Sequence, residues 1–174
     1  MQILRRNMDK SDRPMLKPEL EPLDWLLEVL TLVGLMFFLG YFLYHYRKLP
    51  DIIPSHFSAS GNPNEFSTKS SLWFLPGMAF FIYALLTIIA LIPHQFNYIV
   101  KITPENALRQ YTMAVRLIRY LKMVLTGLFF YICFSTVRFS MKASSGLGMW
   151  FLPLFLTLIL IPLFLYMIVS LRKK

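Results

Sequence analysis

The chain has 174 residues, of which 56% are hydrophobic and only 16% are charged. A typical soluble domain is roughly 25% charged, so the composition excludes an ordinary water-soluble fold and predicts an all-α, polytopic membrane protein. The net charge of +9 does not indicate nucleic acid as a partner, because the basic residues flank apolar segments and no nucleic-acid-binding motif accompanies them.

Residues 1–24 are expected to form a polar cytoplasmic tail. Its three prolines disfavour a long helix, and no short apolar run with a cleavage site follows, so no cleaved signal peptide is expected. Asp24 is the expected cap of the first transmembrane helix, with Glu28 in the first turn. That helix is predicted over about residues 25–46.

Residues 47–71 form a loop punctuated by proline and glycine, and the second span follows over about residues 72–93. Residues 25–93 therefore make a unit of two helices with a structured outer loop between them.

Residues 94–122 are polar again, and Thr103-Pro104-Glu105 predicts the start of a helix. We expect an interfacial helix whose basic side chains face anionic lipid or a cytoplasmic protein partner. The alternative is a solvated charged face. The basic residues concerned are Arg109, Arg116, Arg119 and Lys122.

Two further spans, over about residues 123–139 and 149–171, complete a set of four and make up the C-terminal unit 123–174. Pro162 lies inside the last span, where it is expected to kink the helix and free the carbonyl group of Leu158. No ionisable residue lies deep in any predicted span, which argues against a proton-coupled transporter.

The orientation follows from the positions of the basic residues. With both termini in the cytoplasm, thirteen Lys and Arg lie inside and five outside. The reverse topology would invert this ratio against the positive-inside rule, so we expect the loop 47–71 to lie outside the cytoplasm.

The outer loop gathers side chains that are capable of chemistry. A metal site built from His45, Asp51 and His56, with Glu65 as a base or further ligand, is chemically permissible, but no HExxH-like spacing supports it. The alternative is that Asp51 and His56 pin turns through hydrogen bonds to the backbone. We therefore expect no metal and no cofactor.

The run Leu49-Pro50-Asp51-Ile52-Ile53-Pro54-Ser55-His56-Phe57 is followed by Gly61-Asn62-Pro63 and then by Lys69. This pattern resembles the bacterial membrane domain of unknown function DUF1648, in which LPD-x-[IV]-P-x-H-[FW] precedes G-x-P-[DN] and a lysine before the second helix. The resemblance implies that the loop motif binds a ligand through Pro50, Asp51, Pro54, His56, Phe57, Gly61, Pro63 and Lys69.

The same domain forms the front part of immunity proteins that protect sporulating bacteria from a secreted toxic peptide and hold a repressor at the membrane. The resemblance therefore implies a protein of the bacterial inner membrane whose outer loop meets an extracellular peptide. We expect a non-enzymatic binding, sensory or immunity-like protein, with membrane lipids, such a peptide, a cytoplasmic protein and a second copy of the chain as partners. The alternatives are a metal-dependent membrane enzyme, a transporter component, or a structural subunit of a membrane complex.

Overall fold

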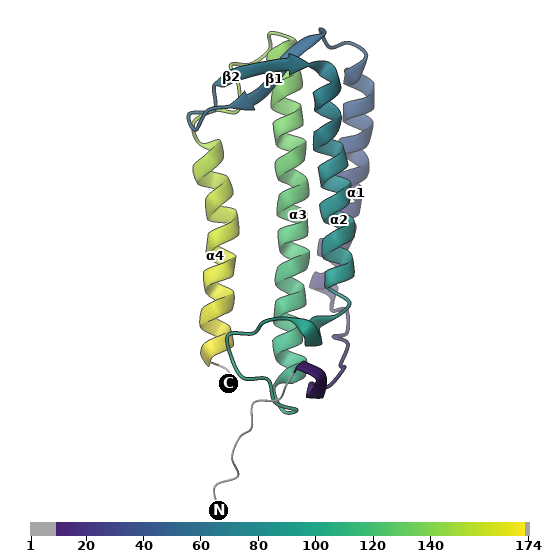
Figure 1. Ribbon diagram of the computed structural model, residues 1–174, viewed down its shortest axis with the longest axis vertical. Coiled ribbons are helices and arrows are strands. Elements are labelled where there is room, and N and C mark those ends of the chain that lie inside the picture. The colour runs from purple at the N-terminus through teal and green to yellow at the C-terminus, as the bar shows by residue number, and fades with distance from the viewer. Residues whose placement is uncertain (1–9, 173–174) are drawn as a thin grey trace, which may run out of the picture.

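The computed structural model describes residues 10–172. Four basic residues of the predicted cytoplasmic ends, Arg5, Arg6, Lys173 and Lys174, lie outside the described residues. Four long helices form an upright bundle, and a two-stranded antiparallel hairpin lies across one end of it (Figure 1). The helices are α1 (Pro22–Tyr46), α2 (Phe74–Ile89), α3 (Ala107–Ser140) and α4 (Phe151–Arg172), and the strands are β1 (Ile52–Phe57) and β2 (Pro63–Thr68).

Four helical segments are long and apolar enough to cross a membrane, which confirms the predicted fold class of a multi-pass, mostly helical membrane protein. They are α1, α3, α4, and α2 together with the 3-10 helix η2 (Lys69–Trp73) that leads into it. The predicted and observed bounds differ most for α3, which is a single helix of 34 residues. It joins the predicted interfacial helix and the predicted third span without a break.

Helix α1 begins earlier than expected because Pro22 fits the first helical turn, where its missing N–H costs nothing. Asp24 is not the cap itself. Its carboxylate oxygen Oδ2 accepts a 3.1 Å hydrogen bond from the backbone N–H of Glu21, the capping residue, as in a capping box.

The main core lies among α1, α2 and α3 and continues into the hairpin. Phe38 and Phe42 of α1 and Val137 of α3 are buried together with Ile53 of β1. Because the side chain of Ile53 is fully buried in this cluster, the hairpin is anchored in the helical core rather than resting on its surface. Helix α4 packs mainly against α3 and keeps most of its surface exposed.

The two ends of the bundle differ in kind (Figure 1). The hairpin end carries β1, β2 and the α3–α4 loop, residues 141–150. The termini end carries the short 3-10 helices η1 (Lys10–Asp12) and η3 (Pro93–Gln95), the segment that leads into α3, and the end of α4.

Tyr98 lies in the segment between η3 and α3 and donates from its hydroxyl to the carbonyl oxygen of Pro93 at 3.0 Å. Burial raises the pKa of Tyr98, which favours the protonated hydroxyl that this bond needs.

Candidate functional site at the hairpin end

The predicted outer loop is a β-hairpin. Its strands IIPSHF and PNEFST flank a polar turn, in which the Ser58 N–H donates to the carbonyl oxygen of Asn62 at 2.8 Å. The register pairs Ile52 with Thr68 and His56 with Glu65, and the ladder is irregular on both sides of His56. Such irregularities turn side chains away from the regular alternation of a strand.

Asp51 and Lys69 close the base of the hairpin. The Asp51 carboxylate lies 2.9 Å from the Lys69 ammonium, and the Lys69 N–H donates to the Asp51 carbonyl oxygen at 2.8 Å. The Asp51 side chain is 90% exposed, so the ion pair contributes little to stability. The acid and the lysine of the motif therefore face each other across the hairpin base, 18 residues apart in the sequence.

His56 lies on the exposed side of the hairpin. Its ring nitrogen Nδ1 is 2.7 Å from the side-chain oxygen Oδ1 of Asn64. With the amide oxygen as acceptor, Nδ1 is the donor, and Nε2 is left as an acceptor. The side chains of Asp51 and His56 thus bond to other side chains. The alternative that they pin turns through hydrogen bonds to the backbone is not what the structure shows.

The four metal-ligand candidates do not come together. His45 lies in α1, where its Nδ1 is 2.9 Å from the carbonyl oxygen of Tyr41, whereas Asp51 bonds to Lys69 and His56 to Asn64. Within residues 10–172, no group of three His, Cys, Asp or Glu side chains is placed to hold a metal ion. His45, Asp51, His56 and Glu65, the side chains that could permit a metal site, are therefore not gathered into one group.

The tip of the hairpin is docked onto the α3–α4 loop through glycine backbones. The Leu147 N–H donates to the Gly61 carbonyl oxygen at 2.8 Å. Gly61 has a φ of +81°, and a Cβ there would lie 2.5 Å from the carbonyl oxygen of Gly148. A Cβ at Gly146 would meet the Gly61 carbonyl oxygen even more closely. Only glycine allows this approach, which gives a structural reason for the motif residue Gly61.

The peptide groups of Leu147 connect the hairpin to α3. While the Leu147 N–H is bound by Gly61, its carbonyl oxygen accepts a 2.9 Å hydrogen bond from the hydroxyl of Tyr131. The Leu147 side chain is itself buried. Hairpin, loop and α3 therefore share one bonded junction, which we call the Leu147 junction.

The outward side of the hairpin combines apolar and polar groups. Ile52 and Phe66 are 58% and 55% exposed, respectively, and His56, Asn64 and Glu65 are exposed beside them. We call these five residues the hairpin face. A hollow of about 480 Å³ adjoins it and is lined by Pro50, Ile52, Pro54, Phe66, Phe139, Ser140, Lys142 and Ser144. A smaller one of about 190 Å³ lies among residues that include Pro54 and Phe57.

Of the four basic residues singled out on α3, only Arg109 is exposed. The Arg116 guanidinium binds both carboxylate oxygens of Asp24, at 3.0 and 2.9 Å. Arg119 lies 3.1 Å from Asp24 and 3.3 Å from Glu28. The expectation of a lipid- or partner-facing role is therefore corrected for Arg116, Arg119 and Lys122, because acids of α1 meet them inside the bundle.

Lys122 is the most deeply placed member of this charge network. Its side chain is 1% exposed, and its Nζ lies 2.6 Å from Glu28 and 3.0 Å from the Thr87 hydroxyl of α2. It also lies over the ring of Tyr83, 4.6 Å from the centroid. A buried cation thus joins α1, α2 and α3. No ionisable residue was expected deep in the predicted spans. The spacings of four residues between the acids and three between the bases place each set along one side of its helix, but they do not show that the two sides meet.

Residues 31–80 match the family model described as a domain of unknown function, DUF1648. The match covers most of α1, the whole hairpin and the first turns of α2. No curated protein and no solved structure matches the chain.

Proposed function

We propose that this multi-pass membrane protein, whose residues 31–80 match the DUF1648 family model, is a non-enzymatic receptor of the bacterial inner membrane. In this proposal the hairpin lies outside the cytoplasm and both termini lie inside it. The ligand is a secreted peptide that binds the hairpin face, as in toxin immunity or peptide sensing.

The observation that carries the proposal is the way the hairpin face is mounted. Its residues are exposed, yet the strand beneath them is fixed in the core by Ile53 and the tip is fixed to the α3–α4 loop by the Gly61–Leu147 hydrogen bond. Preorganised exposed groups lose little conformational entropy when they bind a partner. An apolar hollow that reaches Phe66 and also contains Lys142 suits a peptide with apolar side chains and a carboxylate.

The same mounting provides a route for a signal. A ligand that moves the hairpin tip would act on the Leu147 junction and hence on the start of α4. The far end of α4 is bonded to α3, since the Ser170 hydroxyl and the Gln110 amide oxygen lie 2.8 Å apart. Arg109, next to Gln110, is exposed at the termini end and is the residue we assign to contact a cytoplasmic partner.

The test is survival of cells that lack the protein, complemented with variants and challenged with a panel of secreted membrane-active peptides. Wild-type protein should protect against at least one peptide of the panel, and His56→Ala should abolish that protection. His94→Ala is the matched control, because it removes a histidine from the termini end (Figure 1).

Equal protection by wild type and His56→Ala would show that the hairpin face is not the binding element. Loss of protection in both histidine variants, at equal membrane abundance, would point to a general effect on the protein and would also contradict the proposal.

A further inference from the structure

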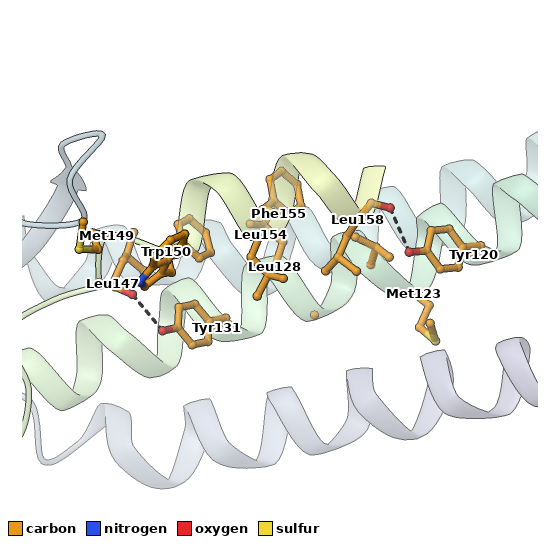
Figure 2. A pocket seen from close by; sticks show the side chains of 14 residues that line it. Tyr120, Met123, Leu128, Tyr131, Leu147, Met149, Trp150, Leu154, Phe155 and Leu158 are labelled. Atoms are coloured by element: carbon orange, nitrogen blue, oxygen red, sulfur yellow. Dashed lines mark hydrogen bonds between the residues drawn. The ribbon is translucent and has the colours of Figure 1, made fainter. Parts of the chain in front are cut away.

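A pocket of about 690 Å³ lies between α3 and α4, next to the Leu147 junction (Figure 2). It is lined along α3 from Tyr120 to Tyr131 and along α4 from Phe151 to Leu158, and the loop residues 147–150 close its end. We propose that this pocket binds one acyl chain of a phospholipid from the membrane leaflet at the hairpin end. This inference concerns a different pocket from the peptide-receptor proposal and does not rest on it, although both use Lys142.

The lining selects hydrocarbon. Apart from two tyrosine hydroxyls and the tryptophan N–H, its side chains are Met, Val, Leu, Phe and Gly. Figure 2 shows both hydroxyls turned to backbone carbonyls: Tyr131 donates to Leu147 at 2.9 Å and Tyr120 to Leu158 at 3.0 Å. Because these donors are already used, the wall between them offers a ligand apolar contact only, and apolar cavities take apolar occupants rather than water.

The depth of the pocket fits a single leaflet. Tyr120 and Tyr131 are eleven residues apart on one helix, which corresponds to about 16 Å along the axis. The hydrocarbon core of a bilayer is about 30 Å thick, so one leaflet contributes about 15 Å. The pocket is therefore about as long as an acyl chain that spans one leaflet.

The hairpin end of the pocket has the properties of a membrane interface. Trp150 and Met149 are strongly exposed there, and tryptophan is enriched at the level of lipid head groups. Arg138 and Lys142 lie in the adjoining segment, and no carboxylate partner for either is found among residues 10–172. Neither the α3–α4 loop, residues 141–150, nor the lining of the pocket contains an acid, so these two cations suit a phosphate head group.

The fold also explains why the space is left open. Helix α4 packs mainly against α3. Tyr120 bonds α3 to α4 at one end of the pocket, and Tyr131 bonds α3 to the α3–α4 loop at the other. Gly127 lies between these points on α3, and a Cβ added there would meet no atom within 4 Å. A side chain at position 127 would therefore start in open space and extend into the pocket.

The test uses Gly127→Leu, with Gly34→Leu on α1 as the matched control. A Cβ at Gly34 also meets nothing within 4 Å, and Gly34 does not line this pocket. Full-length wild type and both variants are delipidated in mild detergent, supplied with phosphatidylglycerol, and analysed by native mass spectrometry. We expect one retained lipid per chain in wild type and Gly34→Leu, and at least about tenfold weaker retention in Gly127→Leu.

A second measurement locates the bound acyl chain in the protein and does not rely on the Gly127→Leu variant. Phosphatidylglycerol with a photoreactive group in its acyl chain is reconstituted with wild-type protein, and the cross-linked peptides are sequenced. Cross-links should concentrate on residues 123–131 and 150–158. The proposal would be overturned if Gly127→Leu retained lipid as well as wild type does, or if the cross-links spread evenly over all four helices. It would also be overturned if Gly127→Leu released a second copy of the protein in place of lipid.

Discussion

The hydroxyl of Tyr120 donates a 3.0 Å hydrogen bond to the carbonyl oxygen of Leu158, the residue four positions before Pro162. Proline has no N–H, so this carbonyl lacks its usual donor within the helix. The Tyr120 hydroxyl of α3 thus provides the Leu158 carbonyl group with the hydrogen bond that α4 itself cannot provide. In a membrane, where no water can replace the lost bond, such a contact holds two helices in a fixed position.

Tyr120→Phe should weaken the attachment of α4 by removing this donor while keeping the ring. Interhelical hydrogen bonds in membranes are worth about 0.6 to 1.7 kcal/mol, so we expect unfolding to become easier by about 1 kcal/mol. Reversible unfolding in detergent or bicelles measures the change. Tyr46→Phe is the control, since its hydroxyl has no hydrogen bond among the described residues. Equal effects of the two substitutions would show that the Tyr120–Leu158 bond does not hold α4.

Lys122→Met should destabilise the bundle more strongly than any loss of a surface charge. It leaves Glu28 with only its longer, 3.3 Å contact to Arg119 at a site where Lys122 is almost fully buried, and breaking one side of a buried pair costs about 3 kcal/mol. The double variant Lys122→Met/Glu28→Met should recover part of that loss, because both charges of the pair are removed and Arg119 keeps Asp24 as its partner. A double-mutant cycle on the unfolding free energy measures the coupling. Strictly additive losses would mean that the two residues do not interact.

Gly61→Ala should release the hairpin tip. A methyl group at position 61 would meet the Gly148 carbonyl oxygen at 2.5 Å, in a backbone conformation that alanine rarely adopts. Gly148→Ala is the matched control, because Gly148 has a similar φ of +83° but open space around its Cβ. Hydrogen exchange of the Leu147 amide, which donates to Gly61, should therefore accelerate more in Gly61→Ala than in Gly148→Ala. If both variants exchanged alike, backbone strain alone would be responsible and the docking would not matter.

Hydropathy and composition were sufficient to predict the four spans, because each is a local property of about twenty residues. The same local reasoning could not predict the charge network. Arg116 and Asp24 are 92 positions apart, and only the packing of α1 against α3 turns a basic helix face into the inside of a bundle. When the partner helix is unknown, a row of basic residues along one side of a helix cannot be distinguished in the sequence from a row that faces lipid.

The hairpin was predicted as a structured outer loop, but not as two strands. Its signal was a polar turn, Ala59 to Asn62, between two six-residue segments with β-branched and aromatic residues. The proline at position 54 obscured that signal, because proline is rare inside paired strands. The docking of Gly61 against Gly146 and Gly148 had no local signal, since it depends on two loops that are about 85 residues apart.

The receptor proposal depends most directly on the hairpin lying outside the cell. Cys133 is the only cysteine and is buried, so Cys133→Ala provides a background for single-cysteine variants. In this background, Ser60→Cys places a thiol at the hairpin tip and Gln95→Cys places one at the termini end. A membrane-impermeant maleimide applied to intact cells should label Ser60→Cys and leave Gln95→Cys unlabelled until the cells are lysed. Labelling of Gln95→Cys but not Ser60→Cys in intact cells would put the hairpin in the cytoplasm and contradict the account.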